Sequence, residues 1–356
     1  MNVFMLRSFL CYNSVMMELY GTLGPSCADI DILRKMLRSG ITGMRLNLSH
    51  TTLRAGSPLC DLLRQACEAE GKSCSLMIDM QGPELRIGDL PAPLTIREGS
   101  VIAISEAPAA EGEGIPVPET VMEYAVSGDI LMMNDGRIKL ELLEDPALRG
   151  RYRAARGKVL AGGTLSVRKS IAIEGKDLSG SLLTEEDLQN LSDAARMGVD
   201  CVMQPFVHSG ADLVKLREIM DSAGLEHCRI FAKIEDRIGL RHVRDIMSRA
   251  DCVVIARGDL GNAMPLWELP AAQKRIAKTC SDAGKPFLVV TQLLASMEEN
   301  PVPTRAEVSD IFNAVADGAG ALMLTGETAA GRYPDRAAYY LVKTVREALS
   351  FYGRQV

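Results

Sequence analysis

Short apolar runs of strand length alternate with longer amphipathic segments of helix length along most of the chain. This alternation is typical of strand and helix units arranged around a parallel sheet. Helical stripes of apolar residues follow Ser26, cover residues 58–70, start again after Thr184 and end near Phe351. The strands predicted for this set lie at residues 18–22, 43–48 and 73–79 and around residues 201, 230, 253, 288 and 322.

Between about residues 88 and 163 the pattern changes to short alternating strands divided by Gly, Pro and acidic turns. We therefore predict two domains, a barrel made of residues 1–87 and 164–356 and a small all-β domain over residues 88–163, inserted after the third strand. The short strands of the insertion are expected at residues 94–97, 101–104, 138–143 and 151–155.

The strand and helix units on both sides of the insertion number eight. A complete set of this kind predicts an α/β fold of the TIM type, a (β/α)8 barrel. An open doubly wound sheet is the alternative that the pattern leaves standing. The first fifteen residues have no evident role, and a native start at Met16 or Met17 is a hypothesis that follows from their position before the first strand.

Composition excludes several classes of protein. The chain is 47% hydrophobic and 24% charged with a net charge of −6, which rules out disorder as its dominant state. No run approaches the roughly 18 apolar residues of a membrane-spanning helix, and the N-terminal segment lacks a signal cleavage site. The nine cysteines form no Cys-x-x-Cys pair and indicate buried thiols in a reducing cytoplasm. An acidic chain with 4% aromatic residues and no basic cluster is not expected to bind nucleic acid.

Charged residues gather where the predicted strands end, which is the edge that carries active sites in this architecture. Lys233 and Glu235 are two residues apart and share one face of their strand, and Asp259 follows the next strand. Two carboxylates, completed by water and substrate oxygens, suit Mg²⁺ at a phosphoryl-transfer site. A solvated ion pair is the alternative for Lys233 and Glu235, and a structural salt bridge is at least as good an account of Arg257 as chemistry.

The second and third strands also end in polar residues. Arg45, Asn47 and Ser49 share one face; the guanidinium suits a phosphate, and the two side-chain oxygens suit a hard cation. Asp79 adds a carboxylate beside them. His50 is better explained as a packing or capping residue than as a catalyst.

Further candidates are Arg86, which could reach a phosphate, and hydroxyls on the last two strands. Thr291 follows the seventh strand, and Thr325 and Thr328 follow the eighth. Phosphate binds at such helix starts in this architecture. An ordinary helix cap by Thr325 or Thr328 is the alternative.

Taken together, these motifs resemble those of pyruvate kinase over nearly the whole chain. Several ordered motifs at consistent spacing are far more specific than one short pattern. The resemblance implies a barrel with a lid-like inserted domain and transfer of a phosphoryl group from phosphoenolpyruvate to ADP, giving pyruvate and ATP. The strings that carry it begin at Arg45 (RLNLSH), Gly82 (GPELR), Asn134 (NDG), Lys233 (KIE), Ala256 (ARGDLG), Pro303 (PTRAE) and Gly326 (GET).

The resemblance also implies roles for single residues. Lys233 would neutralise the phosphoryl group, Arg45 would contact the phosphate, and Thr291 and Thr325 would lie where the enolate is protonated. The remaining roles are divalent metal binding (Mg²⁺ or Mn²⁺) by Glu235 and Asp259, substrate carboxylate binding by Gly258, Asp259 and Thr291, nucleotide binding by Arg86, Lys169, Asn47 and His50, and K⁺ binding by Asn47, Ser49, Asp79 and Met80.

The chain also departs from the family pattern. It ends after the barrel, so we expect no C-terminal effector domain and no family-type allosteric activation by a sugar phosphate. Glu84 favours dependence on K⁺, although Met80 and Gln81 replace the usual neighbours, and Ala55, Ala263 and Ala330 stand where the family has other residues. These departures keep two alternatives open: a related metal-dependent enolpyruvate phosphotransferase with another acceptor or substrate, and a non-catalytic protein that binds phosphoenolpyruvate.

The resemblance also suggests a homo-oligomer, and we expect a dimer formed through barrel faces. Arg305 and Glu307 are expected to serve barrel structure or this subunit contact rather than chemistry.

Overall fold

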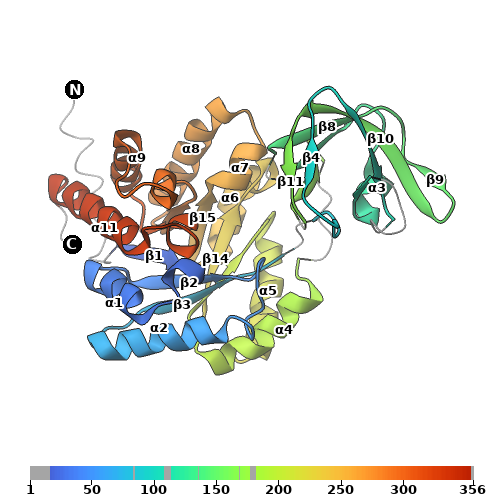
Figure 1. Ribbon diagram of the computed structural model, residues 1–356. Helices are drawn as coiled ribbons and strands as arrows, with labels where there is room; N and C mark the ends of the chain where they lie inside the picture. The colour runs from blue at the N-terminus through green and yellow to red at the C-terminus, as the bar shows by residue number, and fades with distance from the viewer. Residues whose placement is uncertain are drawn as a thin grey trace. The chain divides into compact units, whose positions relative to one another are not determined.

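The computed structural model describes residues 17–82, 85–107, 114–134, 136–167, 169–176 and 182–353 (Figure 1). The chain divides into two compact units, one made of residues 1–82 with 183–356 and the other of residues 83–182. We call them the barrel unit and the inserted unit. The N-terminal segment, on which the start-site hypothesis falls, lies outside the described residues.

In the barrel unit, parallel strands close into a barrel in which β1 pairs with both β2 and β17. This closure confirms the predicted TIM-type fold and excludes the open sheet. The third strand begins two residues later than predicted; the other barrel strands lie where the apolar runs place them. The barrel strands are β1 Glu18–Thr22, β2 Gly43–Asn47, β3 Ser75–Asp79, β13 Cys201–Gln204, β14 Arg229–Ile234, β15 Cys252–Ala256, β16 Phe287–Val290 and β17 Ala321–Met323.

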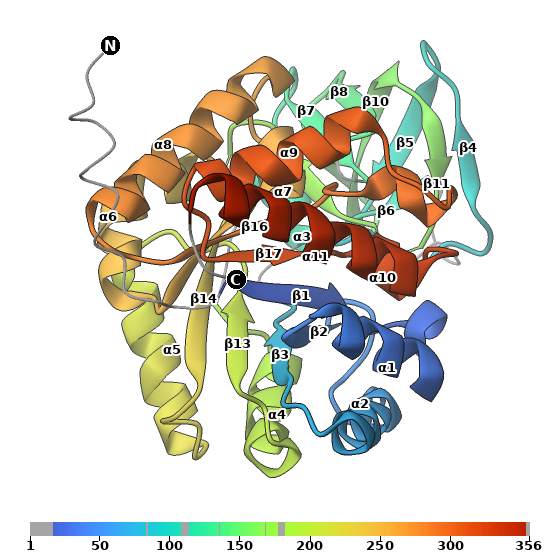
Figure 2. The same cartoon turned by 90° about the vertical axis from the view of Figure 1, so that its left-hand side faces the viewer.

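Helices follow the barrel strands, and Figure 2 shows them on the outside of the barrel. Helices α4, α5 and α9 each start at a capping box, in which a Thr or Ser hydroxyl and the acid three residues later satisfy each other's backbone N–H groups. Among the described residues, none of the helices combines the length and the hydrophobicity of a membrane-spanning segment. The helices are α1 Ile30–Ser39, α2 Ser57–Glu70, α4 Glu185–Ala194, α5 Gly210–Ser222, α6 Arg237–Arg249, α7 Arg257–Asn262, α8 Leu269–Asp282, α9 Arg305–Ala316, α10 Gly326–Ala329 and α11 Pro334–Phe351.

The barrel interior is packed with side chains rather than hollow. Tyr20, Phe231, Met203 and Val254 belong to one cluster of buried residues contributed by seven of the strands. At the start of the strands this cluster meets a polar network, in which Arg229 donates to both carboxylate oxygens of Glu18, at 2.7 and 2.9 Å. The cysteines of the described part are all free thiols. Six of them are buried, as the sequence predicts, whereas Cys67 and Cys74 are half-buried.

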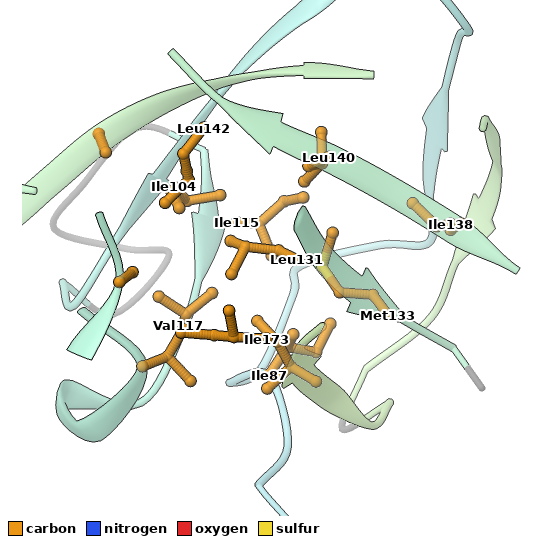
Figure 3. Close-up of a cluster of buried hydrophobic side chains, with 14 of the residues drawn as sticks. Ile87, Ile104, Ile115, Val117, Leu131, Met133, Ile138, Leu140, Leu142 and Ile173 are labelled. Carbon is orange, nitrogen blue, oxygen red and sulfur yellow. The ribbon is translucent and has the colours of Figure 1, made fainter. Parts of the chain in front are cut away.

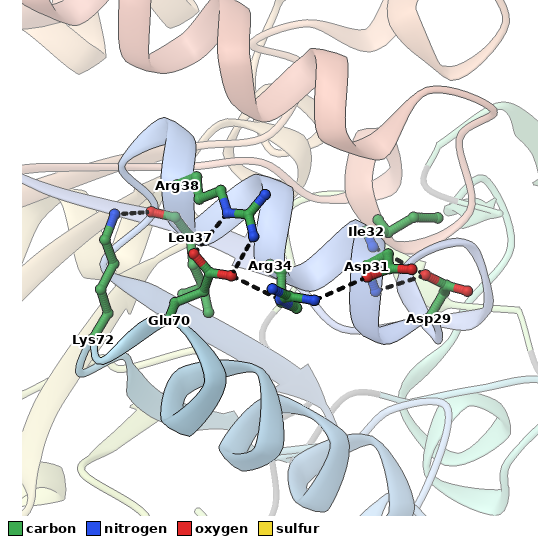
Figure 4. Close-up of polar contacts among 8 residues, drawn as sticks. All are labelled: Asp29, Asp31, Ile32, Arg34, Leu37, Arg38, Glu70 and Lys72. Atoms are coloured by element: carbon green, nitrogen blue, oxygen red, sulfur yellow. Dashed lines mark hydrogen bonds and ion pairs between the residues drawn. The ribbon is translucent and has the colours of Figure 1, made fainter.

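A set of polar contacts joins the C-terminal ends of α1 and α2 (Figure 4). Glu70 accepts hydrogen bonds from Arg34 at 2.7 Å and from Arg38 at 2.7 Å through both of its oxygens. Lys72 donates to the carbonyl of Leu37, at 2.7 Å. This network fixes the pairing of the first two helices on the barrel wall.

The inserted unit is built around a largely antiparallel sheet with the strand order β12-β7-β8-β10-β5-β6. The buried side chains in Figure 3 form its own core, with Ile104, Leu131, Leu140 and Ile173 among them. The elements of this unit are β4 Leu94–Ile96, β5 Val101–Ser105, β6 Ile115–Pro116, α3 Glu119–Tyr124, β7 Ile130–Met133, β8 Ile138–Leu142, β9 Ala147–Arg149, β10 Tyr152–Ala161, β11 Gly163–Leu165 and β12 Ile171–Ile173.

The inserted unit extends beyond the predicted bounds of 88 and 163. Strand β12 lies after residue 163 and pairs with β7, so this segment belongs to the inserted sheet. The unit also contains a short helix, α3, where the sequence predicts only strands. Such short strands and helices carry too little hydrophobic periodicity to be separated from turns in one sequence.

Candidate active site

The ends of β3 and β14 bring together an ammonium group and two carboxylates. The Nζ atom of Lys233 lies 2.8 Å from Oε1 of Glu235 and 3.5 Å from Oδ1 of Asp79. The Lys233 side chain is 14% exposed, and the whole Glu235 residue is 2% exposed. The ion pair between Lys233 and Glu235 is therefore largely withdrawn from water, and the solvated pair considered as an alternative is wrong.

The charge state of Lys233 follows from these neighbours. Burial disfavours the ammonium, but the carboxylates of Asp79, Glu235 and Asp259 outweigh burial and raise the pKa of Lys233 above its usual value. The side chain is therefore a fixed positive charge at neutral pH. It lies among three carboxylates contributed by or near three different strands.

A strained turn orients Glu235. Phe206, which follows β13, has a φ of 49°, a value that a bulky residue rarely adopts. Its backbone N–H donates to the second oxygen of Glu235, Oε2, at 2.8 Å. Such strain is found where surrounding structure enforces a functional geometry. The sequence offers no sign of this contribution, because neither Phe206 nor its neighbours form a polar motif.

Asp79 also contacts Arg45, whose Nη1 lies 3.3 Å from Oδ2 of Asp79. Arg45 is 8% exposed, and its Nε has no hydrogen-bond partner among the described residues. A buried guanidinium nitrogen without a partner is costly in a folded protein. It is therefore a donor available to an anionic ligand, in keeping with the phosphate contact expected for Arg45.

The proposed K⁺ ligands lie at the ends of β2 and β3, where Asn47 and Asp79 are direct neighbours across the two strands. Oδ1 of Asn47 accepts the N–H of Ser49 at 3.1 Å and so shapes the following turn. The N–H of Met80 donates to the carbonyl of Met203, at 2.9 Å. His50 is exposed just beyond this turn. Glu84 lies outside the described residues.

The donor set at Lys233 fits a hard divalent cation. Glu235 follows β14 and Asp259 follows the neighbouring strand β15. The Glu235 carboxylate accepts two hydrogen bonds and keeps further lone pairs free for a cation. Within the described residues no group of three or more His, Cys, Asp or Glu could enclose a metal. A site with two carboxylates is suited to Mg²⁺, which keeps several waters and takes substrate oxygens.

Thr291 and Gln292 follow the end of β16 and form a turn, in which their φ values are 77° and 55°. Arg257 supports this strained turn: its Nη2 and Nε donate to the carbonyl of Thr291 at 2.6 and 3.1 Å, and its Nη1 pairs with Asp310 at 2.6 Å. These contacts favour the structural explanation of Arg257. Gly258 lies against Thr291, since a Cβ at this glycine would come within 3.3 Å of the threonine methyl group.

After β17, the buried Glu327 organises the last turn. It accepts the N–H of Thr325 at 2.7 Å, the hydroxyl of Thr325 at 3.1 Å and the N–H of Leu294 at 3.0 Å. The hydroxyl of Thr328 instead donates to the carbonyl of Thr22 at 3.0 Å. Neither threonine hydroxyl caps α10, so the helix-cap explanation is wrong. The sequence motif contains Glu327, but its spacing gives no hint that this acid holds two loops.

Arg86 and Lys169 both belong to the inserted unit. Arg86 forms an antiparallel bridge with Ser170, and the N–H of Ile87 donates to the carbonyl of Lys169 at 2.9 Å. The two basic residues therefore lie on adjacent extended segments. Arg86 is directly opposite Ser170, and Lys169 is opposite Ile87, so this pairing does not by itself bring the two basic side chains to one face.

Comparison with known proteins identifies the family. Residues 16–338 match the family model described as pyruvate kinase, barrel domain. The chain is 34% identical over 92% of its length to a pyruvate kinase of Geobacillus stearothermophilus, covering 55% of that protein. It is 36% identical over 92% of its length to that of Aeropyrum pernix and 37% identical over 93% to that of Agrobacterium vitis, covering 69% and 67% of them.

The chain thus spans about half to two thirds of the length of these relatives. The matched region contains every barrel strand and all of the strand-end residues described above. The chain belongs to the pyruvate kinase family.

Proposed function

We propose that this protein transfers the phosphoryl group of phosphoenolpyruvate to ADP, forming pyruvate and ATP. The observation that carries the proposal is the largely buried Lys233, held between Asp79 and Glu235 at the carboxyl end of the barrel. A fixed ammonium and a pair of carboxylates able to hold Mg²⁺ are what stabilisation of a transferring phosphoryl group requires. Membership of the family supports the same reaction.

In this proposal, Glu235 and Asp259 hold Mg²⁺ or Mn²⁺. When bound there, the cation would neutralise charge on substrate oxygens. Lys233 stabilises the negative charge of the phosphoryl group during transfer, and the unpaired Nε of Arg45 donates to the phosphate. Each of these residues lies on a barrel strand or directly after one, so the groups are positioned by the closed parallel sheet.

The substrate carboxylate is proposed to bind the backbone N–H groups of Gly258 and Asp259 at the first turn of α7, together with the hydroxyl of Thr291. The close approach of Gly258 to Thr291 supports this placement. Transfer of the phosphoryl group leaves an enolate, which must gain a proton to become pyruvate. Thr291 and Thr325 are proposed to hold the proton-donating water in place.

For the nucleotide we propose Asn47 and His50 from the barrel unit and Arg86 and Lys169 from the inserted unit. Asn47, Ser49, Asp79 and the carbonyl of Met80 are proposed to bind K⁺, an assignment supported by the direct pairing of Asn47 with Asp79.

We also propose that the protein works in the cytoplasm as a homodimer formed through barrel faces. Free thiols throughout the described residues support a reducing compartment. On the barrel, Leu266 and Trp267 are 70% and 82% exposed, which is unusual for large apolar side chains and supports an interface there. Sedimentation velocity of the protein and of a Trp267→Glu variant tests the dimer.

The test of the reaction compares Lys233→Met and Glu235→Gln with the parent protein. Both variants should lose at least about 1000-fold in kcat/KM, because each removes charge stabilisation at the transferring group. Glu70→Gln is the matched control, since this carboxylate also binds basic residues but lies between α1 and α2. Activity retained in Lys233→Met would overturn the proposed role. Pyruvate formed without ATP would point instead to another phosphate acceptor.

A further inference from the structure

The chain leaves the barrel unit after Gly82 and returns to it at Leu183. The exit crossing lies close to the site, because Gly82 follows Asp79 by three residues, and the return crossing is next to Thr184, the N-cap residue of α4. Contacts that hold these two crossing segments within the barrel unit also hold the points at which the inserted unit is attached to it. The contacts at this place are therefore of interest apart from the reaction itself.

One carboxylate binds both crossings. Asp187 on α4 accepts the N–H of Gln81 through Oδ1 at 2.9 Å and the N–H of Gly82 through Oδ2 at 2.9 Å. The same Oδ2 accepts the N–H of Thr184 at 3.0 Å. The residue is 0% exposed. Three backbone donors from two segments more than 100 positions apart thus converge on a single buried side chain.

These contacts exceed what a helix cap needs. In a capping box, the acid at the third helical position accepts only the N–H of the cap residue, here Thr184. Such an acid normally lies in the exposed first turn. Asp187 is buried instead and takes two additional N–H groups from the segment after β3. Its burial and its extra donors remain unexplained by capping alone.

The exit segment is also held by shape. Gly82 has a φ of +63°, and a Cβ added there would lie 2.4 Å from Cγ of Pro205. The N–H of Met80, two residues earlier, donates to the carbonyl of Met203 on the neighbouring strand β13. The backbone from residue 80 to residue 82 is therefore defined by Met203, by Pro205 and by Asp187, and only the last of these also binds the return segment.

We infer that Asp187 is a positioning residue that ties the exit and the return of the inserted unit to one point on α4. It is not among the residues proposed to bind the substrates. Because Asp79 is held in the β-ladder on both sides, loss of the Asp187 contacts should leave the barrel part of the site in place. The consequence should fall on steps that need the inserted unit, which by the proposed function means use of the nucleotide.

The first test needs no variant and no activity. Amide hydrogen exchange of the parent protein, read residue by residue, should show the N–H groups of Gln81, Gly82 and Thr184 protected by at least about 100-fold relative to an unstructured peptide. Gln81 and Gly82 lie outside regular secondary structure, where exchange is otherwise fast. Unprotected amides at Gln81 and Gly82 would overturn the inference.

The second test compares Asp187→Asn with Thr184→Ala. The asparagine keeps the size of the side chain but turns an NH₂ group towards backbone donors, so exchange at Gln81 and Gly82 should rise by about 10-fold or more. Thr184→Ala removes the capping hydroxyl but leaves all three N–H contacts with Asp187, and exchange at Gln81 and Gly82 should stay within about twofold of the parent. If exchange at Gln81 and Gly82 accelerated equally in both variants, Asp187 would act only as part of the helix cap, and the inference would be wrong.

The kinetic test rests on the proposed function. Asp187→Asn should lower kcat/KM for ADP by about 10- to 100-fold while changing the affinity for phosphoenolpyruvate, measured calorimetrically with Mg²⁺ and without nucleotide, by less than about twofold. Equal losses in both quantities would contradict a positioning role. If the parent protein proved inactive, the proposed function would fail, whereas the exchange experiments would still decide the inference.

Discussion

Arg257 gives the most quantitative prediction, because it supports two residues in a disfavoured backbone conformation. Thr291 and Gln292 both have positive φ values, and each such residue costs about 1–3 kcal/mol. Arg257 offsets part of this cost with a partly buried guanidinium that donates twice to the carbonyl of Thr291 and once to Asp310. Arg257→Met removes all of these bonds and leaves Asp310 without its cation.

The expected loss can be worked out from these contacts. Hydrogen bonds to charged groups are worth about 1.5–3 kcal/mol each and are not additive within one side chain. Relaxation of the turn at Thr291 returns part of the strain, so we expect Arg257→Met to lower the free energy of unfolding by about 2–3 kcal/mol. Displacement of Thr291 should also lower kcat/KM by about 100-fold. Arg257→Lys should give intermediate values, since an ammonium cannot reproduce the planar fork of the guanidinium.

The assay is urea unfolding followed by far-ultraviolet circular dichroism, together with steady-state kinetics. Tryptophan fluorescence is a poor probe here, because the single tryptophan, Trp267, is 82% exposed. The reasoning is refuted if Arg257→Met unfolds within about 0.5 kcal/mol of the parent and keeps its kcat/KM, a range typical of neutral surface changes.

Three further predictions concern a pH dependence, a close approach and a ligand. Hydrogen bonds from Arg38 and Arg34 lower the pKa of Glu70 to about 2. The contribution of Glu70 to stability should therefore be complete above about pH 4.5 and disappear as the pH falls towards 2. In urea unfolding measured against pH, the free energy of unfolding of Glu70→Gln should depend less on pH in this window than that of the parent. Gly24→Ala should destabilise by about 2 kcal/mol, because the new Cβ would lie 2.4 Å from the carbonyl oxygen of Ala329, and an unchanged thermal midpoint would contradict this. Removal of K⁺ should lower activity in the parent but have little effect in Asp79→Asn, and equal rates with and without K⁺ in the parent would exclude the proposed ligands.

The barrel could be predicted from the sequence because its strands are continuous apolar runs and its helices carry clear stripes. The helix predicted after Thr184 begins at Glu185, where Thr184 and Asp187 form a capping box. The strands of the inserted unit were predicted less completely, since β7 and β12 are short and lack a distinctive alternation. In such segments the pairing partner, rather than the local sequence, decides the structure.

The site residues also differ in whether the sequence alone can predict them. Those at strand ends, such as Lys233 and Glu235, follow from a period of two along one strand. The residues that support them do not, because their partners are distant in sequence: Phe206 orients Glu235 from the preceding strand, and Asp187 joins segments on both sides of the insertion. Such contacts depend on strained turns and buried donors that a single sequence does not reveal.

The most direct test of the central claim is an assay of phosphoenolpyruvate with ADP and other nucleoside diphosphates in the presence of Mg²⁺, with and without K⁺, following pyruvate and nucleoside triphosphate together. We predict equal amounts of both products, with turnover that disappears in Lys233→Met and persists in Glu70→Gln. Pyruvate without triphosphate, or binding of phosphoenolpyruvate without either product, would contradict the account.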